Sequence, residues 1–434
     1  MDLRLKAKNW ERLDGHAKSI VCGPFGSNLL NDNYVDKGIP MIRPFNLRKC
    51  RADRGEIALL EESFVNSTGL KTFGFGAVMF ARVGEIGAGI NLYEQATISP
   101  NIIAADLHNT INPFYVGVFS NTKYGKTQLE AGMKVVAQPT ISTESIRAFR
   151  VPRFSHDFEN KIADIFNFSV QKEDQASELL KNAENTLLET LGLSNWTPPT
   201  PLSYVRSSNE AFTAGRFDAE YFHPAKKSAL SILDNLSDAR VGDFFESVRD
   251  LWQPSKSKDA AVRNHDLTDA LEPFLDPTKV PTLIEEIRST KKLVQPGDLV
   301  VSRLRSYLRE IAVVLPGNGT TTVVSTEYIV LRPKKSSQLA IEALLIYLRS
   351  QLPQIVFKWS QDGSNHPRFD ENELLNIPIP RALISNQVNY VKAMQEMIAQ
   401  RQLAVSLLEA AKRAVEIAIE DSEAAALAYL QGVV

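Results

Sequence analysis

Residues 138–153 of the chain read Gln-Pro-Thr-Ile-Ser-Thr-Glu-Ser-Ile-Arg-Ala-Phe-Arg-Val-Pro-Arg, and residues 366–381 read His-Pro-Arg-Phe-Asp-Glu-Asn-Glu-Leu-Leu-Asn-Ile-Pro-Ile-Pro-Arg. The two stretches repeat one another at a constant offset of 228 positions. The matched pairs are Pro139 with Pro367, Ile141 with Phe369, Ile146 with Leu374, Val151 with Ile379 and Pro152 with Pro380. Self-similarity at a fixed spacing predicts two copies of one structural plan.

The repeat continues on both sides of these stretches. Downstream, apolar residues keep the offset of 228, as in Phe166 with Met394. Upstream the matched segments are Phe75-Gly-Ala-Val-Met-Phe-Ala-Arg82 with Pro296-Gly-Asp-Leu-Val-Val-Ser-Arg303, at an offset of 221, and Ser99-Pro-Asn-Ile-Ile with Ser325-Thr-Glu-Tyr-Ile, at 226. A drifting offset is typical of loop insertions. The alternative, that any two amphipathic helices look alike, does not explain why glycine, arginine and proline positions align as well.

Each copy combines a strand-rich part with a helix. Short apolar runs broken by Gly, Pro, Asn and Asp predict an α+β domain at the start of the chain. Apolar residues at helical spacing follow, with Ser155 as N-cap and Gly192 as stop. The predicted division is a first domain over 1–154, a first helix over 155–192, a proline-rich linker and second domain over 193–384, with a helical lead-in at 220–236, and a second helix with a C-terminal tail over 385–434.

The two helices are acidic and carry narrow apolar seams. Residues 155–192 hold 3 Lys+Arg against 8 Asp+Glu, and residues 385–425 hold 4 against 6. Such a seam suits pairing with another long helix, so we predict an antiparallel coiled-coil spacer related by a pseudo-twofold internal repeat. The alternative is that each helix packs on its own domain. The seam residues expected at a helix or subunit interface are Phe166, Val170, Leu180, Leu187, Met394, Ile398, Leu408 and Val415.

Composition excludes several classes of protein. The 434 residues are 44% hydrophobic and 23% charged, which argues against a disordered, collagen-like or disulfide-stapled chain. Cys22 and Cys50 fit a reducing compartment, and no signal peptide or membrane span is evident, so we expect a cytoplasmic protein. With 49 Lys+Arg against 51 Asp+Glu, the net charge of −2 argues at first sight against a nucleic-acid binder.

Enzyme signatures are incomplete. Phe73-Gly-Phe-Gly76 and Asn112-Pro-Phe-Tyr115 superficially resemble the motifs of an adenine methyltransferase, but the second proline is missing and no acidic residue immediately precedes the glycines. The clustered carboxylates and lysine of a metal-dependent nuclease are absent, and the six histidines give no metal-ligand spacing. No Gly-x-Ser-x-Gly elbow is present. We therefore expect neither catalysis, nor a cofactor, nor a metal.

Four segments resemble the specificity subunits of type I restriction–modification systems. They are Gly23-Pro-Phe-Gly-Ser-Asn-Leu-Leu-Asn-Asp-Asn-Tyr34 with the following Gly38-Ile-Pro-Met-Ile-Arg-Pro-Phe-Asn46, Gly297-Asp-Leu-Val-Val-Ser-Arg303, Arg216-Phe-Asp-Ala-Glu-Tyr-Phe-His-Pro224, and Ile377-Pro-Ile-Pro380 before a long helix. The resemblance covers essentially the whole chain. It implies two target recognition domains that read a bipartite, asymmetric site on double-stranded DNA, with the helices as a ruler. It also implies DNA adenine methyltransferase and restriction (translocase) subunits as partners, which carry the chemistry.

DNA sequence is read mainly by Arg, Lys, Asn, Gln and His, while further Lys and Arg contact phosphates. The candidates in the first domain are Arg43, Asn46, Arg48, Arg82, Lys123, Lys126 and Lys134. Those in the second are Arg263, His265, Arg303, Arg305, Arg309, Lys358 and Arg368. For each one, a solvated surface charge or a structural ion pair is the competing interpretation.

Three other functions remain in competition. One is a non-catalytic specificity or adaptor subunit of a different DNA-modification or defence complex. Another is a helical adaptor that binds only proteins, and the last, an active methyltransferase, lacks a cofactor signature. The net charge of −2 is misleading when taken for the whole chain. The first domain, residues 1–154, carries +5 and the second, 193–384, carries 0, while the helical stretches 155–192 and 385–434 carry −5 and −2. The positive charge therefore lies in a predicted DNA-reading domain and the negative charge on the helices.

Overall fold

The computed structural model describes residues 7, 9–24, 33–53, 55, 57–84, 86–134, 139–363 and 365–433. The chain divides into two compact units. The first unit consists of residues 1–174 and 400–434, and the second of residues 175–399. Each unit is a mixed α/β domain together with half of each of two long helices, α5 (His156–Thr190) and α12 (Arg381–Glu420).

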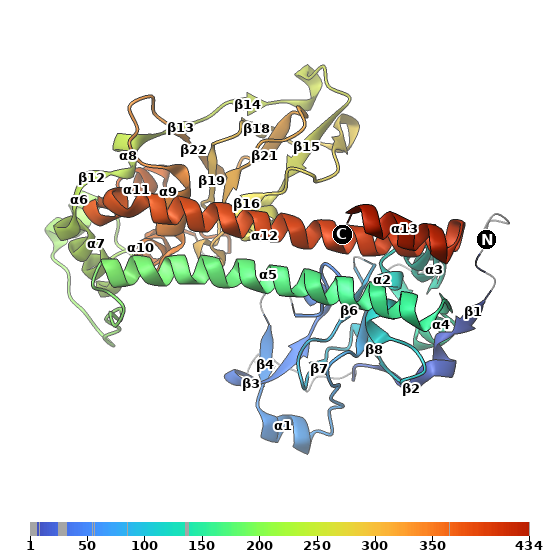
Figure 1. The fold of residues 1–434 in the computed structure, drawn as a ribbon. Helices are drawn as coiled ribbons and strands as arrows, with labels where there is room; N and C mark the ends of the chain where they lie inside the picture. Colours follow the sequence, from blue (N-terminus) through green and yellow to red (C-terminus); the bar gives the residue numbers. More distant parts are fainter. Residues whose placement is uncertain are drawn as a thin grey trace. The chain divides into compact units, whose positions relative to one another are not determined.

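The first unit is built on two small sheets (Figure 1). The antiparallel one has the order β2 (Ala17–Cys22), β8 (Ile102–Leu107), β5 (Val78–Ala81), β6 (Ala88–Ile90). The other has the order β4 (Ala58–Leu60), β3 (Tyr34–Ile42), β7 (Thr97–Ile98). Two-stranded pairs join β1 (Trp10–Arg12) to β11 (Arg150–Pro152) and β9 (Met133–Lys134) to β10 (Thr140–Ile141). The helices are α1 (Glu62–Ser67), α2 (Pro113–Ser120), α3 (Lys123–Ala131) and α4 (Thr143–Arg147).

The second unit enlarges the same arrangement. One sheet has the order β13 (Phe245–Val248), β22 (Tyr328–Pro333), β19 (Leu299–Ser302), β20 (Ile311–Val314), β16 (Phe274–Leu275). The other has the order β14 (Leu251–Trp252), β18 (Lys291–Val294), β21 (Thr322–Ser325), β15 (Ala261–His265), β17 (Thr282–Leu283), and β12 (Ser237–Arg240) pairs with β23 (Pro378–Pro380). The helices are α6 (Ser208–Ala214), α7 (Pro224–Leu236), α8 (Val241–Phe244), α9 (Ile341–Arg349), α10 (Gln351–Ser360) and α11 (Glu371–Leu375).

The register of the strands repeats between the units. Val78 of β5 pairs with Ala105 of β8, and Leu299 of β19 pairs with Leu331 of β22. Val78 and Leu299 are separated by the sequence offset of 221, and Ala105 and Leu331 by the offset of 226. The turn before each of these central strands needs a left-handed glycine, Gly76 at φ 87° and Gly297 at φ 89°. The internal repeat is therefore visible residue by residue in the hydrogen-bonded sheets.

The first long helix has the ends that the sequence predicts. Ser155 Oγ accepts a hydrogen bond from Phe158 N at 3.2 Å, and Gly192 has φ 72°. The second long helix ends at Glu420, before the expected C-terminal tail, but its start and the tail itself differ from the expectation. It begins earlier, as α12 at Arg381, and a break at residues 421–422 separates it from α13 (Glu423–Val433).

Halves of the two long helices run antiparallel inside the first unit. Near the start of α5, Ser155 binds Glu423, and further along, Ser169 Oγ donates to Ala404 O at 2.8 Å. In the second unit the end of α5 and the start of α12 share one core, with Leu187 and Met394 both buried. Each helix half also packs on the α/β domain of its own unit, as the alternative considered from sequence expects.

This packing corrects the expected subunit interface. Five of the eight seam residues are buried in the core of their own unit, namely Phe166, Leu187, Met394, Leu408 and Val415. The others, Val170, Leu180 and Ile398, are partly buried against the same cores. The expectation that these side chains dock a partner subunit was wrong, because the seam is already covered by the chain itself.

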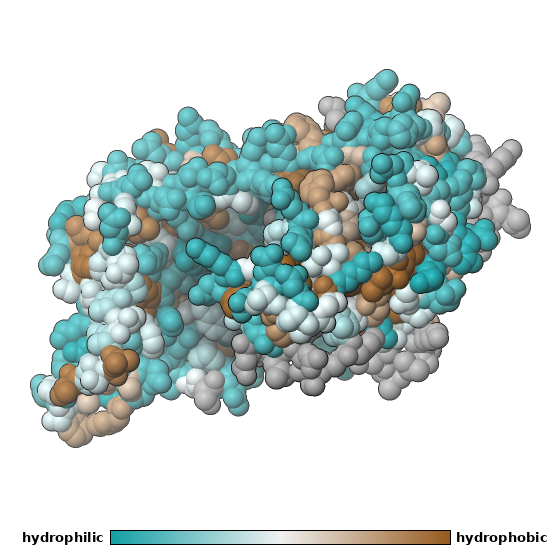
Figure 2. Space-filling view, turned by 90° about the horizontal axis from the view of Figure 1, so that it is seen from below, coloured by the Kyte–Doolittle hydropathy of each residue, from teal (hydrophilic) through white to brown (hydrophobic). Residues whose placement is uncertain are grey.

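A short helix from outside each α/β domain completes each core. In the first unit α13 buries Ala426 and Leu430, and in the second α7 buries Ala229 and Leu233. Over the described ranges, no helix is both long and apolar enough to cross a membrane. The face drawn in Figure 2 is mostly hydrophilic, with apolar side chains in separate patches.

Candidate nucleic-acid interface

An arginine-bearing turn follows β19 in the second unit. This arginine turn, residues 303–309, surrounds a short 3-10 helix at Ser306–Leu308. Arg305 and Arg309 have φ values of 51° and 52°, a left-handed conformation that costs a residue with a side chain about 1–3 kcal/mol. The turn exposes Arg305, Arg309 and Tyr307, whose side chain is 61% exposed. Strain of this kind persists where the surroundings hold it, and it is typical of functional loops.

Neighbouring backbone holds the arginine turn in place. Arg303 O accepts from Phe369 N at 3.1 Å, and Pro367 O accepts from Arg305 N at 3.1 Å, which ties the turn to the hairpin at 362–368. From α9, the partly buried Arg349 donates Nη1 to Arg309 O at 2.9 Å, and desolvation lowers its pKa to about 10. The turn is therefore anchored on two sides.

Glu327 joins the turn to the hairpin through side chains. Its carboxylate accepts Nε and Nη2 of Arg368, both at 2.8 Å, and Nε of Arg303 at 3.2 Å. The hydrogen bonds from Arg368 lower the pKa of the Glu327 carboxyl below its ordinary value. Glu327 was not among the residues expected from sequence. The available signal was its position in the repeat, where a carboxylate replaces Asn101 beside a matched arginine.

Arg82 occupies the matching position in the first unit. Its N–H donates to Asn101 O at 2.9 Å and its carbonyl accepts from Ile141 N at 3.0 Å. The corresponding bonds of Arg303 run to Glu327 O at 3.2 Å and from Phe369 N at 3.1 Å. The side chains differ, because Arg82 Nε turns back to Ile141 O at 3.3 Å. The two units thus present different chemistry on one backbone plan.

A second candidate surface in the first unit is the loop at 43–51. The Arg43 guanidinium lies 4.4 Å from the centroid of the half-exposed Phe45 ring, and Arg48 is exposed. Lys49 has φ 51°, and its ammonium binds Glu173 of α5 at 2.7 Å. In the second unit the left-handed Arg309 binds Glu184 of α5 at 3.5 Å. In both units, a strained basic residue therefore links the candidate surface to the first long helix.

Asn46 is a correction to the expected base readers. It is fully buried, and its Oδ1 accepts from Arg43 N at 2.9 Å. In the second unit Asp269 Oδ2 accepts from Asp266 N in the same way, at 2.7 Å and 223 positions further on. Asn46 therefore closes a structural turn that both copies share.

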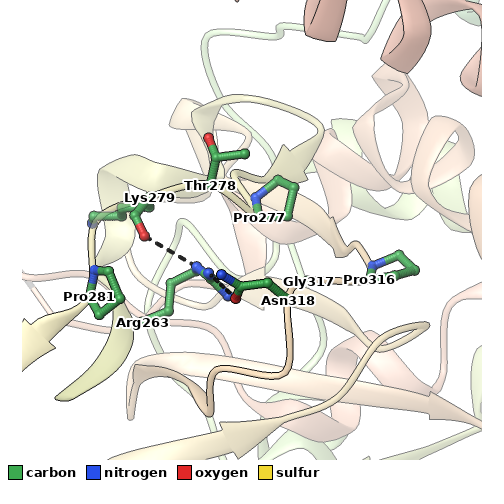
Figure 3. Close-up of a pocket in the computed structure, with 8 residues that line it drawn as sticks. All are labelled: Arg263, Pro277, Thr278, Lys279, Pro281, Pro316, Gly317 and Asn318. Carbon is green, nitrogen blue, oxygen red and sulfur yellow. Dashed lines mark hydrogen bonds between the residues drawn. The ribbon is translucent and has the colours of Figure 1, made fainter. Parts of the chain in front are cut away.

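Arg263 is also buried, at 3% exposure, and lines a pocket of about 340 Å³ in the second unit (Figure 3). Its guanidinium donates Nε to Lys279 O at 3.2 Å and Nη2 to Asn318 Oδ1 at 2.9 Å. It holds the segment at 277–281 to the loop at 316–318, so the expectation of an exposed DNA contact was wrong.

His265 is the third correction. It is 1% exposed, and neither ring nitrogen has a hydrogen-bond partner among the residues that the structure describes. Its Nδ1 lies 3.8 Å from Asp269 Oδ2. Burial lowers the pKa of His265 to about 4, so the ring is neutral at physiological pH and lies in the core.

The remaining candidates are scattered. Lys123 is exposed but its ammonium binds Glu420 at 2.6 Å, while Lys126 is exposed on the same helix, α3. Lys358, on α10, is exposed with its ammonium 4.8 Å from the centroid of the Trp359 ring. The side chain of Lys134 and residues 25–32 of the glycine-rich opening lie outside the described residues. Within the second unit, the structure thus brings together Arg303, Arg305 and Arg368.

Within the described ranges, no group of three or more His, Cys, Asp and Glu side chains is placed to hold a metal ion.

No family model matches the chain, and no curated protein matches it. Among solved structures, the HsdS subunit from Thermoanaerobacter tengcongensis matches at 12% identity with a TM-score of 0.32, covering 95% of this chain and 97% of its own. A chain from a structure described as "Structural basis underlying complex assembly and conformational transition of the type I R-M system" matches at 12% identity and a TM-score of 0.32, covering 95% and 98%.

The type I restriction–modification system S subunit from M. genitalium matches at 12% identity with a TM-score of 0.39, covering 97% of this chain and 98% of its own. Two of the three descriptions name a type I restriction–modification system, and the other names an HsdS subunit.

Proposed function

We propose that the chain is the DNA-specificity subunit of a type I restriction–modification complex and reads a bipartite, asymmetric site. The observation that carries this is one α/β plan built twice, in which the shared strands keep their order and register while the side chains at matched positions differ. Arg82 is matched by Arg303, Asn101 by Glu327, and Thr140 by Arg368. Two readers that share a backbone and differ in side chains suit two different half-sites.

The two long helices separate the half-sites in this proposal. A helix of 35 residues, such as α5, rises roughly 50 Å at 1.5 Å per residue. That length corresponds to about 15 base-pair steps at 3.4 Å each. The helices would therefore act as a ruler for the unspecified gap.

Catalysis belongs to partner subunits in this proposal. DNA adenine methyltransferase subunits transfer the methyl group, and restriction subunits supply translocation and cleavage. The chain itself is a non-catalytic cytoplasmic subunit that needs no cofactor of its own. An alternative is the same specificity or adaptor role in a different DNA-modification or defence complex, which shares the DNA reader and differs in the partners.

The decisive experiment exchanges one domain. Residues 1–154 are replaced by the first domain of another specificity subunit, and the methylated sequence is read by methylome sequencing of the host with the methyltransferase partner present. We expect one half of the site to change while the other half and the gap stay the same. A matched exchange of residues 193–384 should change the opposite half.

Each result has a definite meaning. If both halves change after either exchange, the two domains do not read separate half-sites. If DNA binding with every candidate partner lacks sequence preference, the specificity role is wrong and a protein-binding adaptor remains. If the chain directs methylation but restriction never follows, the alternative complex is favoured.

A further inference from the structure

We propose that Arg303 reads a guanine in the second half-site and that Glu327, clamped by Arg368, is the residue that positions it. This rests on the proposed function, because it assumes that the second domain reads DNA. It adds the base that is read, the side chain that reads it, and the carboxylate that orients that side chain.

The hydrogen bonds divide the two arginines into a clamp and a reader. All three guanidinium nitrogens of Arg368 are engaged, two by Glu327 at 2.8 Å and Nη1 by His366 O at 2.9 Å. Arg303 uses only Nε, while Nη1 and Nη2 make no hydrogen bond to any part of the chain that the structure describes. Its side chain is 43% exposed. Arg368 therefore fixes Glu327, and Glu327 fixes the plane of Arg303.

The free end of Arg303 has the form of a guanine reader. Two parallel N–H groups match O6 and N7 of guanine in the major groove, which is the commonest specific arginine contact. A backing carboxylate restricts the direction of the fork, which a base contact needs. The turn holds the Arg303 backbone through Phe369 N on one side and Glu327 O on the other. Both the main chain and the side chain are thus oriented in advance.

A base edge fits this environment better than a phosphate does. Glu327 places a negative charge beside Arg303, which weakens its attraction for a phosphate and has little effect on a neutral guanine edge. Arg305, exposed two residues further along, forms no hydrogen bond or ion pair with a carboxylate in the described part of the chain and acts on the buried Glu310 only through its charge. The phosphate contact is therefore better assigned to Arg305 than to Arg303.

The first unit provides the contrast. The positions that match Glu327 and Arg368 hold Asn101 and Thr140, so the carboxylate and its clamp are not repeated at those positions. Arg82 turns toward Ile141 O. We therefore expect this guanine contact in the second half-site alone, with a different type of contact in the first.

The test uses the full chain with its methyltransferase partner, after the target has been obtained by selection from random duplexes. Each guanine of the second half-site is replaced in turn by 7-deazaguanine, which lacks the N7 acceptor. One such replacement should weaken binding by roughly 5- to 150-fold. In Arg303→Lys, which keeps the charge and loses the fork, that penalty should disappear.

Glu327→Gln tests the positioning role. The variant should reduce the 7-deazaguanine penalty in the second half-site only, while binding to a random duplex stays equal or becomes stronger because a negative charge is removed. Glu371→Gln is the matched control. Its carboxylate is 21% exposed against 24% for Glu327 and binds Arg249 in the same unit, so it should leave the penalty unchanged.

The outcomes separate the two proposals. A second half-site without guanine, or a 7-deazaguanine penalty that survives in Arg303→Lys, overturns the guanine contact while the specificity role stands. A loss caused instead by methylphosphonate at one phosphate, and tolerated by the lysine variant, assigns Arg303 to the backbone and also overturns it. Absence of any sequence preference in either half rejects the proposed function itself.

Discussion

His265 lies where the first unit has an isoleucine. It pairs with Val324 across parallel strands as Ile42 pairs with Ile98, and both His265 and Ile42 are buried. An imidazole in such a position is stable only when it is neutral. Because burial lowers its pKa from 6.5 to about 4, the unfolded chain binds a proton at higher pH than the folded chain does.

The stability that this group contributes is therefore complete above pH 6.5 and is lost as the pH falls toward 4. At 1.36 kcal/mol per pKa unit, His265 should lower the free energy of unfolding by about 2 kcal/mol between pH 7 and pH 5. The change His265→Ile introduces the residue of the matched position and removes the titration. Urea unfolding at both pH values should show that the wild type loses about 2 kcal/mol more than the variant. An equal loss in both proteins would contradict this account.

At the scale of the elements, most of the repeat could be predicted from the sequence. The offsets of 221 and 226 reappear as the register of β5 with β8 and of β19 with β22. The reason is physical, because apolar strand residues, left-handed glycines and junction prolines are constrained by local geometry that the sequence reports directly. The ends of α5 follow from its serine cap and glycine stop in the same way.

The local sequence pattern did not reveal which of the candidate side chains are buried and which are exposed. Arg263 and Asn46 are polar residues in a DNA-reader pattern, yet both are buried, Asn46 against its own turn and Arg263 by the distant loop at 316–318. The apolar stripes of the two long helices were expected to contact partner subunits. The sequence of a helix shows that such a stripe must be covered, but it does not show whether the same chain or another subunit covers it. Glu327 was missed for the converse reason, since its importance comes from two arginines 24 and 41 positions away.

The short helices α7 and α13 have equivalent roles, because each contributes a buried leucine to the core of one unit. Mutation of each leucine can show which unit it stabilises. Leu233 of α7 and Leu430 of α13 are each buried in the core of one unit. Truncation to alanine leaves a cavity and should cost about 2–5 kcal/mol in either case. Hydrogen exchange should show Leu430→Ala loosening β5 and β8, and Leu233→Ala loosening β19 and β22. The two variants are controls for one another, and an equal response of both sheets to either change would contradict the assignment.

At the scale of the whole molecule, the net charge of −2 conceals a separation of charge. Residues 1–154 carry +5, residues 193–384 carry 0, and the two helical stretches carry −5 and −2. Some of the positive charge is already neutralised within the chain, as Lys123 by Glu420 and Lys49 by Glu173. Ion pairs of this kind reduce the positive charge available to phosphates, and the arginine turn gathers three of the proposed DNA contacts, Arg303, Arg305 and Arg309.

This distribution predicts weak, weakly salt-dependent DNA binding by the chain alone. Each phosphate that a protein neutralises adds about −0.9 to the slope of log K against log salt, so a chain with few free cations should give a shallow slope. Adding the methyltransferase partner should steepen it, since the remaining positive surface must come from that subunit. Arg305→Gln should reduce the slope of the complex by about 0.9, whereas Arg303→Lys should leave it unchanged. A slope as steep for the isolated chain as for the complex would show that the chain carries the whole electrostatic footprint itself.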